Sequence, residues 1–172
     1  MGIPVAVKDI IATKDFVTSN GSAIYKDFVP SEDAEIVKKI RSLGGVIFGK
    51  SVTTEFAWRH AGVTTNPWNN AHTPGGSSSG SAAAVASGIV PLSLGSQTAG
   101  SIIRPASYCG VIGYKASFGA IPRKGAHPVS ESLDHIGFFT RSVADARYAF
   151  KLDDNTPFSV RWIMLGEGNP KK

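Results

Sequence analysis

The sequence predicts an α/β fold, a mixed β-sheet flanked by helices, in one domain or part of one. Three segments near the start carry this prediction. Residues 3–7 form a short apolar, β-branched run, residues 31–43 show the pattern of an amphipathic helix, and residues 45–50 form a second apolar run. This strand–loop–helix–strand order favours strands that are at least partly parallel.

The first strand carries Lys8 at its end, and two interpretations of that lysine stand side by side. It can reach solvent from the strand end, or it can lie in a desolvated pocket that lowers its pKa enough for it to act as a base. A turn is expected at residues 18–21. Ser31 is expected to start the first helix, since acidic residues fall in its first turn, and a glycine pair at 44–45 ends it.

The middle of the chain alternates helices with turns. Residues 54–60 are consistent with a short helix, and residues 64–74 are expected to be a loop because they contain two prolines and three asparagines. A helix of small residues is expected after Ser79, which is assigned the role of its cap. Further on, residues 102–108 predict a helix and residues 111–114 a strand.

The last segments are less regular. Residues 119–135 are rich in turns, and Ser142 is expected to open a final helix with Asp145 at the capping-box position. The apolar face of that helix is predicted from Val143, Ala146, Ala149 and Phe150. We therefore divide the chain into a core at residues 1–150 and a C-terminal tail at residues 151–172 that shows no clear period.

Composition excludes several classes of function. The 172 residues carry a formal charge of +5, from 18 Lys+Arg and 13 Asp+Glu, without the basic stripe typical of nucleic-acid binding. No run is long enough to span a membrane, and the start lacks the pattern of a signal peptide. Cys109 is the only cysteine, and His60 and His72 have no partner at ligand spacing, so no metal or other cofactor is expected. A cytoplasmic location is the default expectation.

The stretch at residues 75–115 carries the chemistry: GGSSSGSAAAVASGIVPLSLGSQTAGSIIRPASYCGVIGYK. Its glycines allow backbone N–H groups to converge on one point, and the interleaved apolar residues are not typical of a flexible linker. Ser101 follows three small residues, Thr98, Ala99 and Gly100, whose backbone N–H groups can stabilise an oxyanion, so Ser101 is a candidate nucleophile. Residues 76–80 also match G-x-S-x-G around Ser78, but a loop precedes them where that motif requires a strand.

These motifs resemble the signature of the amidase signature family. The glycine- and serine-rich block and GSQTAGSIIRPASYCGVIGYK resemble its signature, and GIPVAVKD at residues 2–9 resembles its lysine-bearing segment. The resemblance covers about residues 2–150, and it implies an amide hydrolase that works through a Ser–Ser–Lys relay. By motif position the nucleophile is Ser101, the bridging serine is Ser77 and the base is Lys8. The resemblance also implies a cis peptide bond between Gly76 and Ser77.

The resemblance further implies a small amide as substrate. The charge distribution and the lack of a long apolar run indicate no nucleic-acid or membrane partner, and a homo-oligomer stays open. An arginine in the position of Arg104 resembles members that act on amides bearing a carboxylate, so Arg104 is assigned to substrate binding, with a structural ion pair as the alternative. The same acyl-enzyme route accepts esters. Two other functions stay open: the glutaminase subunit of a tRNA-dependent amidotransferase, whose family usually has an aspartate where Gln97 stands, and a catalytically dead truncated domain.

Overall fold

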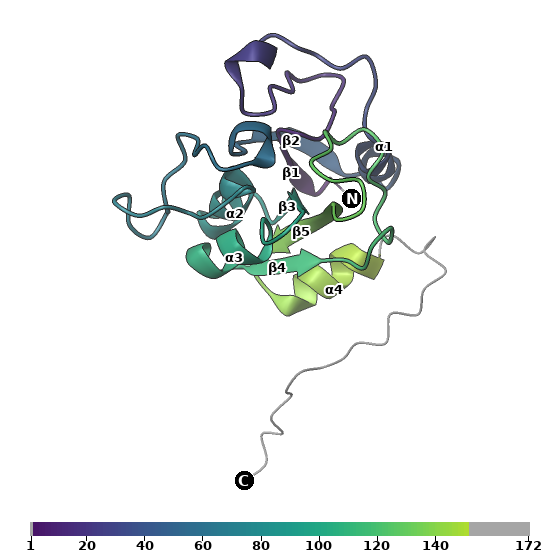
Figure 1. Ribbon diagram of the computed structural model, residues 1–172. Helices are drawn as coiled ribbons and strands as arrows, with labels where there is room; N and C mark the ends of the chain where they lie inside the picture. Colours follow the sequence, from purple (N-terminus) through teal and green to yellow (C-terminus); the bar gives the residue numbers. More distant parts are fainter. Residues whose placement is uncertain (1, 152–172) are drawn as a thin grey trace.

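A five-stranded mixed sheet forms the centre of the protein in a computed structural model that describes residues 2–151 (Figure 1). The strands lie in the order β2-β1-β3-β5-β4. Their bounds are β1 Pro4–Lys8, β2 Val46–Ser51, β3 Leu92–Gln97, β4 Ile112–Lys115 and β5 His135–Thr140. Strands β2, β1 and β3 are parallel, and β5 is antiparallel to both β3 and β4. The predicted mixed sheet is therefore confirmed.

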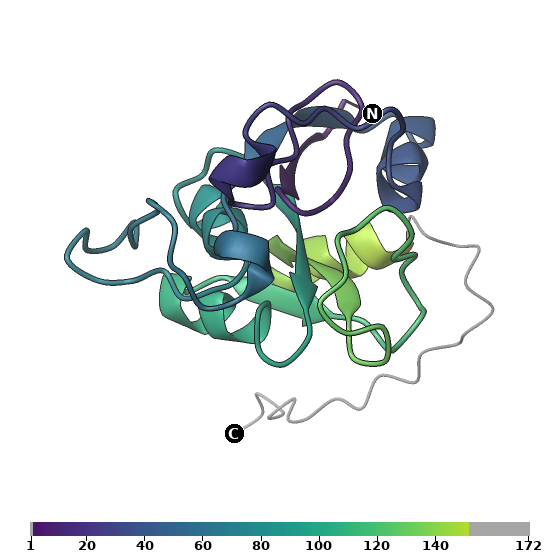
Figure 2. The same cartoon turned by 45° about the horizontal axis from the view of Figure 1, so that its top comes forward.

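Helices cover both faces of this sheet. Their bounds are α1 Glu35–Ser42, α2 Ser79–Ala86, α3 Ile103–Cys109 and α4 Val143–Lys151, with short 3₁₀ turns at Ala23–Tyr25 and Glu55–Ala57. Figure 2 shows α2 and α3 on one side of the sheet and α1 and α4 on the other. The fold thus has the three layers typical of an α/β architecture.

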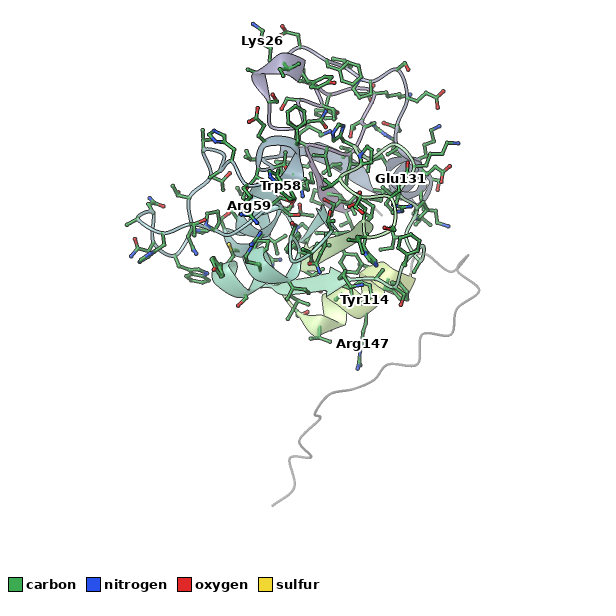
Figure 3. All side chains as sticks on the ribbon, in the orientation of Figure 1. Lys26, Trp58, Arg59, Tyr114, Glu131 and Arg147 are labelled. Carbon is green, nitrogen blue, oxygen red and sulfur yellow. The ribbon has the colours of Figure 1, made fainter. Side chains whose placement is uncertain are left out.

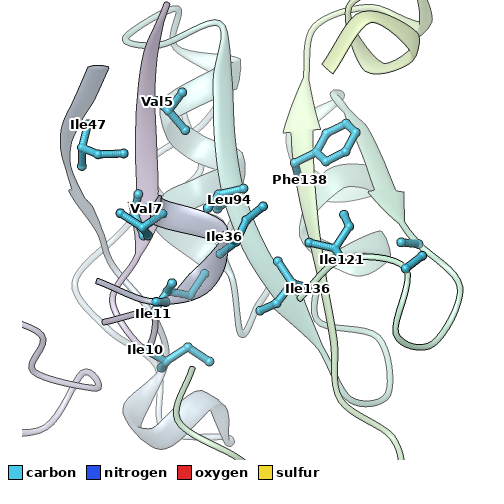
Figure 4. Packing of buried hydrophobic residues seen from close by; sticks show 14 of the residues in the cluster. Val5, Val7, Ile10, Ile11, Ile36, Ile47, Leu94, Ile121, Ile136 and Phe138 are labelled. Atoms are coloured by element: carbon cyan, nitrogen blue, oxygen red, sulfur yellow. The ribbon is translucent and has the colours of Figure 1, made fainter. Parts of the chain in front are cut away.

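Two apolar clusters fill the space between these layers. On the side of α1 and α4, Val5 and Val7 of β1 pack with Leu94 of β3, Phe138 of β5 and Ile36 of α1 (Figure 4). On the side of α2 and α3, the cluster is Ala6, Ala82, Val85, Val90, Ile102, Ala106, Cys109 and Phe139. Because side chains alternate along a strand, β1 contributes to both clusters and is buried on both faces.

Helix α2 approaches the sheet closely because its residues are small. A Cβ atom added at Gly80 would lie 2.3 Å from the backbone nitrogen of Val52, and the Gly80 N–H donates to the Val52 carbonyl at 2.9 Å. The hydroxyl of Ser81, fully buried, donates to the Leu94 carbonyl at 2.8 Å. Small side chains are therefore a requirement of the packing here, and a flexible linker is ruled out for this stretch.

The structure corrects where two helices begin. Helix α1 starts at Glu35 and not at Ser31, because the amide of Ala34 donates to the Ala12 carbonyl and Asp33 accepts from the Lys14 amide instead of starting a helix. Ser79 is not a cap: it lies inside α2, and its hydroxyl donates to the Val52 carbonyl at 3.3 Å.

Three smaller predictions also need correction or fall outside the structure. The short helix expected at residues 54–60 is only the 3₁₀ turn Glu55–Ala57, because Phe56 and Ala57 adopt positive φ angles that an α-helix cannot contain. Val143 is 52% exposed and does not belong to the apolar face of α4, whereas the capping box between Ser142 and Asp145 is present. The predicted tail, from residue 152 on, lies outside the described residues.

Strands β3 and β5 were not predicted from the sequence. Strand β3, LSLGSQ, has two serines, a glycine and a glutamine among six residues, so it lacks the β-branched run that indicates a strand. Gly95 is needed there because a Cβ atom would lie 2.6 Å from the ring of Phe139 on β5. The tight pairing of β3 with β5 therefore selects small residues in the middle of the sheet.

Candidate active site

The candidate site lies at the carboxyl ends of the parallel strands β1 and β3. Lys8 is the last residue of β1, and Ser96 and Gln97 are the last two of β3. Parallel neighbours place these ends at one edge of the sheet, and ligand sites in α/β sheets form at such edges. The turn at residues 98–101 continues from β3 and leads directly into α3.

Lys8 is fully buried, and its side-chain nitrogen lies between two serine hydroxyls. Its Nζ is 2.7 Å from Oγ of Ser77 and 2.8 Å from Oγ of Ser96. Burial lowers the pKa of Lys8 from 10.5 to about 7, because a charged amine loses its hydration inside the protein, while the carboxylate of Asp134 raises the pKa in part. The structure therefore buries Lys8, with its pKa lowered to near neutral pH, and the interpretation of a strand-end lysine that reaches solvent is wrong.

Ser77 is held by the glycine turn that precedes α2. The Gly76–Ser77 peptide bond is cis, as the resemblance implied, and the Ser77 carbonyl accepts from the Thr54 amide at 3.0 Å. Gly75 adopts φ +78°, a left-handed conformation that glycine enters without steric cost. Together these contacts present the Ser77 hydroxyl to Lys8.

Ser101 joins the cluster through the backbone. Its carbonyl accepts from the amide of Ser78 at 3.3 Å, so the two glycine turns are in direct contact, and Ser101 is 9% exposed. Within residues 2–151, no hydrogen bond joins the Ser101 hydroxyl to Ser77 or Lys8. The fold thus brings all three predicted residues to one place and connects two of them, Lys8 and Ser77, by a side-chain hydrogen bond.

The turn before Ser101 has the features of an oxyanion site. In the described part of the chain, the amides of residues 98–100 donate none of the turn and loop backbone hydrogen bonds. The Gln97 side chain stabilises the other end of this turn, because its Oε1 accepts from the amides of Ile102 at 2.8 Å and Ile103 at 3.0 Å. The start of α3 is therefore capped by a neutral group, and the amides ahead of it stay open to an acceptor.

Asp134 ties this turn to the opposite loop. One carboxylate oxygen accepts from the Thr98 hydroxyl at 2.5 Å, and the other accepts from the amides of Val129 and Ser130 at 2.8 and 2.9 Å. A cavity of about 340 Å³ is lined by Asp134, Thr98 and Ser96 together with the basic residues of the 123–127 loop. Asp134 thus positions Thr98 and places a negative charge near Lys8.

Sequence reasoning missed the roles of Ser96, Gln97 and Asp134. The local pattern places the first two in a turn, because it does not indicate β3. Asp134 immediately precedes β5, another strand that was not predicted, so nothing indicated that it lies opposite Thr98. Polar residues at the ends of strands often belong to a site, and this rule would have indicated Ser96, Gln97 and Asp134 if β3 and β5 had been predicted.

Arg104 has a partner that neither sequence interpretation included. Its Nε and Nη2 atoms donate to the Gly76 carbonyl at 2.9 and 2.7 Å, so the guanidinium binds the peptide group that joins Gly76 to Ser77. No ion pair of Arg104 is found among the described residues.

Ser78, the central residue of G-x-S-x-G, is fully buried and donates to the Ser96 carbonyl at 3.1 Å.

The described residues contain no group of three or more His, Cys, Asp or Glu side chains that could hold a metal ion. Across residues 2–151, every helix is too short or too polar to cross a membrane.

Comparisons with known proteins show the family to which the chain belongs. A family model described as Amidase matches residues 1–155. A glutamyl-tRNA(Gln) amidotransferase subunit of Natranaerobius thermophilus is 47% identical over 157 residues, which make up 88% of this chain and 32% of that protein. The chain thus spans about one third of the length of the curated relatives it matches.

Solved structures show the same similarity. The crystal structure of the corresponding glutamyl-tRNA(Gln) amidotransferase subunit from Thermotoga maritima matches with a TM-score of 0.83 and 42% identity, over 87% of this chain and 34% of that one. Native peptide amidase from Stenotrophomonas maltophilia matches with a TM-score of 0.83 and 39% identity, over 87% of this chain and 33% of that one.

Proposed function

Because the chain belongs to the amidase family, we propose that it supplies the catalytic groups of an amide hydrolase that cleaves a small carboxylic amide through a seryl acyl-enzyme. The observation that carries the proposal is the buried Lys8, whose Nζ lies 2.7 Å from Ser77 and whose pKa is lowered to about 7 by burial. A lysine base must be neutral to accept a proton, and a pKa near the working pH suits that role.

In the proposed reaction, neutral Lys8 accepts the proton of the Ser77 hydroxyl while Ser77 accepts the proton of Ser101. The Ser101 oxygen then forms a bond to the amide carbonyl carbon, and the negative charge moves to the carbonyl oxygen. The amides of Thr98, Ala99 and Gly100 stabilise that oxyanion. When the tetrahedral intermediate collapses, the C–N bond breaks, and the nitrogen takes a proton back through Ser77 and leaves as ammonia or an amine.

Water completes the cycle by the same route. It attacks the carbonyl carbon of the ester formed on Ser101 and gives a proton to Lys8 through Ser77. The bond from this carbon to the Ser101 oxygen then breaks, the Ser101 oxygen takes the proton back from Lys8 through Ser77, and the carboxylic acid leaves. Since this acyl-enzyme also forms from an ester, esterase side activity belongs to the proposal. In the described structure Lys8 Nζ and Ser77 Oγ are already within hydrogen-bond distance, and the relay needs in addition that the Ser77 hydroxyl donates to Lys8 and the Ser101 hydroxyl donates to Ser77.

The test is intact-mass analysis after exposure to a serine-directed fluorophosphonate, with Ser101→Ala and Lys8→Ala in parallel. We expect one adduct on the wild type, none on Ser101→Ala and slow labelling of Lys8→Ala. A cooperatively folded wild type without an adduct would refute the relay and would leave a catalytically inactive domain as the function.

A second candidate is the glutaminase component of an amidotransferase. The observation that favours it is the 47% identity to a protein named as a glutamyl-tRNA(Gln) amidotransferase subunit. Against it stands Gln97, where that group usually has an aspartate. Ammonia release from glutamine, compared with release from propionamide, distinguishes the two candidates: a glutaminase prefers glutamine, and the amidase proposed here does not.

A further inference from the structure

The loop between β1 and α1 carries an exposed apolar surface. Residues 23–29, AIYKDFV, are seven consecutive exposed residues, and five of them are apolar or aromatic. Ile24 is 78% exposed, and Phe28 and Val29 are about half exposed. Single exposed apolar side chains are common, whereas a contiguous group of them marks an interaction surface. The apolar members of this group, here called the tip patch, are Ile24, Tyr25, Phe28 and Val29.

Hydrogen bonds and ring contacts order this loop. The amide of Thr18 donates to the Phe28 carbonyl at 2.8 Å and closes the loop, and Nζ of Lys50 on β2 donates to the Thr18 hydroxyl at 2.7 Å. The Tyr25 ring contacts Phe28 edge-on, with ring centroids 5.9 Å apart, and Phe56 in the same way at 6.1 Å. A patch that is already ordered loses little freedom when a partner binds, which improves affinity.

The charges beside the tip patch determine which partner fits it. Lys26 and Asp27 lie in the middle of the exposed run, both mostly exposed, with Nζ and Oδ2 3.9 Å apart, and Figure 3 shows Lys26 at the outer end of the loop. The two side chains add up to no net charge. The patch therefore lacks the charge that would attract an anionic lipid surface, a nucleic acid or a strongly charged peptide.

A second copy of the chain presents the same pair of opposite charges. A two-fold axis sets the same surface of both copies against each other, in reversed direction. In such an arrangement Lys26 of each copy can lie opposite Asp27 of the other, while the apolar side chains meet in the centre. The surface is thus complementary to itself in both charge and hydrophobicity.

We propose that the tip patch is the contact surface of a symmetric dimer of this chain, with two ion pairs between Lys26 and Asp27 of opposite copies at its edge. An apolar centre with a polar rim is the usual arrangement of protein interfaces, and aromatic residues are enriched in it. The dimer does not depend on the proposed hydrolysis, because none of these residues belongs to the relay of Lys8, Ser77 and Ser101.

The mass of the protein in solution tests the apolar centre. Sedimentation velocity is measured at concentrations of roughly 1 to 500 µM for the wild type, Ile24→Glu and Val63→Glu. We expect the wild-type mass to rise from monomer to dimer, and Ile24→Glu to weaken association by roughly 10-fold or more, because it places a charge in the apolar centre. Val63 is 91% exposed in the loop that precedes α2, outside the patch, so Val63→Glu is the matched control and is expected to dimerise like the wild type.

Charge reversal tests the ion pairs. Lys26→Glu gives each copy two negative charges beside the patch, and Asp27→Lys gives it two positive charges, so each variant alone is expected to stay monomeric. An equimolar mixture of the two variants is expected to form a heterodimer, because opposite charges then face each other. Since both side chains are mostly exposed, the variants are expected to fold, and a cooperative thermal melt checks this.

Three results would overturn the dimer. The first is a wild type that stays monomeric at every concentration, and the second is a dimer that Ile24→Glu and both charge reversals leave unchanged. The third is flotation of monomeric wild type with phosphatidylcholine vesicles, which would assign the tip patch to a membrane surface instead. Fluorophosphonate labelling of Ser101 is expected to be the same in Ile24→Glu and wild type, so this proposal and the proposed function can fail separately.

Discussion

Replacing Lys8 by methionine tests the central electrostatic statement, that the folded protein holds this lysine neutral. Methionine is unbranched and close in length to lysine, so it can occupy the same space without a charge. The unfolded chain keeps Lys8 protonated at pH 7 and at pH 9, because the ordinary lysine pKa is 10.5. The native protein, with a Lys8 pKa of about 7, is half protonated at pH 7 and neutral at pH 9.

The magnitude follows from linkage. A folded pKa below the unfolded one means that the native state binds fewer protons, so the free energy of unfolding rises with pH between about 7 and 10.5. From pH 7 to pH 9 the native state gains about 2 kcal/mol from this group, after allowance for the half-titrated state at pH 7. The hydrogen bonds that methionine cannot make to Ser77 and Ser96 cost the same at both values of pH, and therefore cancel in the comparison.

The assay is chemical denaturation of both proteins at pH 7 and pH 9. We expect the unfolding free energy of the wild type, relative to Lys8→Met, to increase by about 2 kcal/mol between the two values of pH. Lys38→Met is the matched control: Lys38 lies on the exposed side of α1, with its pKa raised by Glu32, so it does not titrate in this range. An equal effect of pH on wild type and Lys8→Met would show that Lys8 keeps its proton and cannot be the base.

Three further predictions concern the neighbours of this lysine and the packing of α2. Asp134→Asn removes the negative charge that raises the Lys8 pKa, so the rising limb of kcat/KM against pH is expected at lower pH; an unmoved limb would remove Asp134 from the electrostatics of the site. Gln97→Met keeps the length of the side chain but removes the acceptor that caps α3, so the amides of Ile102 and Ile103 lose their partner and we expect destabilisation by about 1–3 kcal/mol in urea titrations; an unchanged unfolding free energy would contradict this. Gly80→Ala is expected to destabilise the fold by about 1–3 kcal/mol in urea titrations, because its Cβ meets the backbone of Val52 just after β2, whereas Gly49→Ala has open space and serves as the control; equal effects of the two would disprove the packing argument.

Local patterns sufficed for the parts of the fold with strong hydrophobic signals. The apolar runs before Lys8 and after Gly45 form β1 and β2 as expected, and the helix at residues 102–108 appears as Ile103–Cys109. Strand β3 escaped prediction because its residues are small and polar, and their size is set by Phe139 and by Ser78, which lie on other elements. No local pattern carries that constraint.

For the site, motif order predicted that Lys8, Ser77 and Ser101 belong together. The apolar run before Lys8 predicted that this lysine lies at the end of a strand. Only the tertiary structure decided the state of Lys8, because its pKa depends on complete burial and on Asp134, which lies 126 positions away by residue number (134 against 8). The partner of Arg104 was decided in the same way, by the contact between two turns that are distant in the chain. The sequence determines which residue types occur and in which order. The desolvation of a side chain and the charges near it depend on all the groups that surround it, and these groups come together only when the chain is folded.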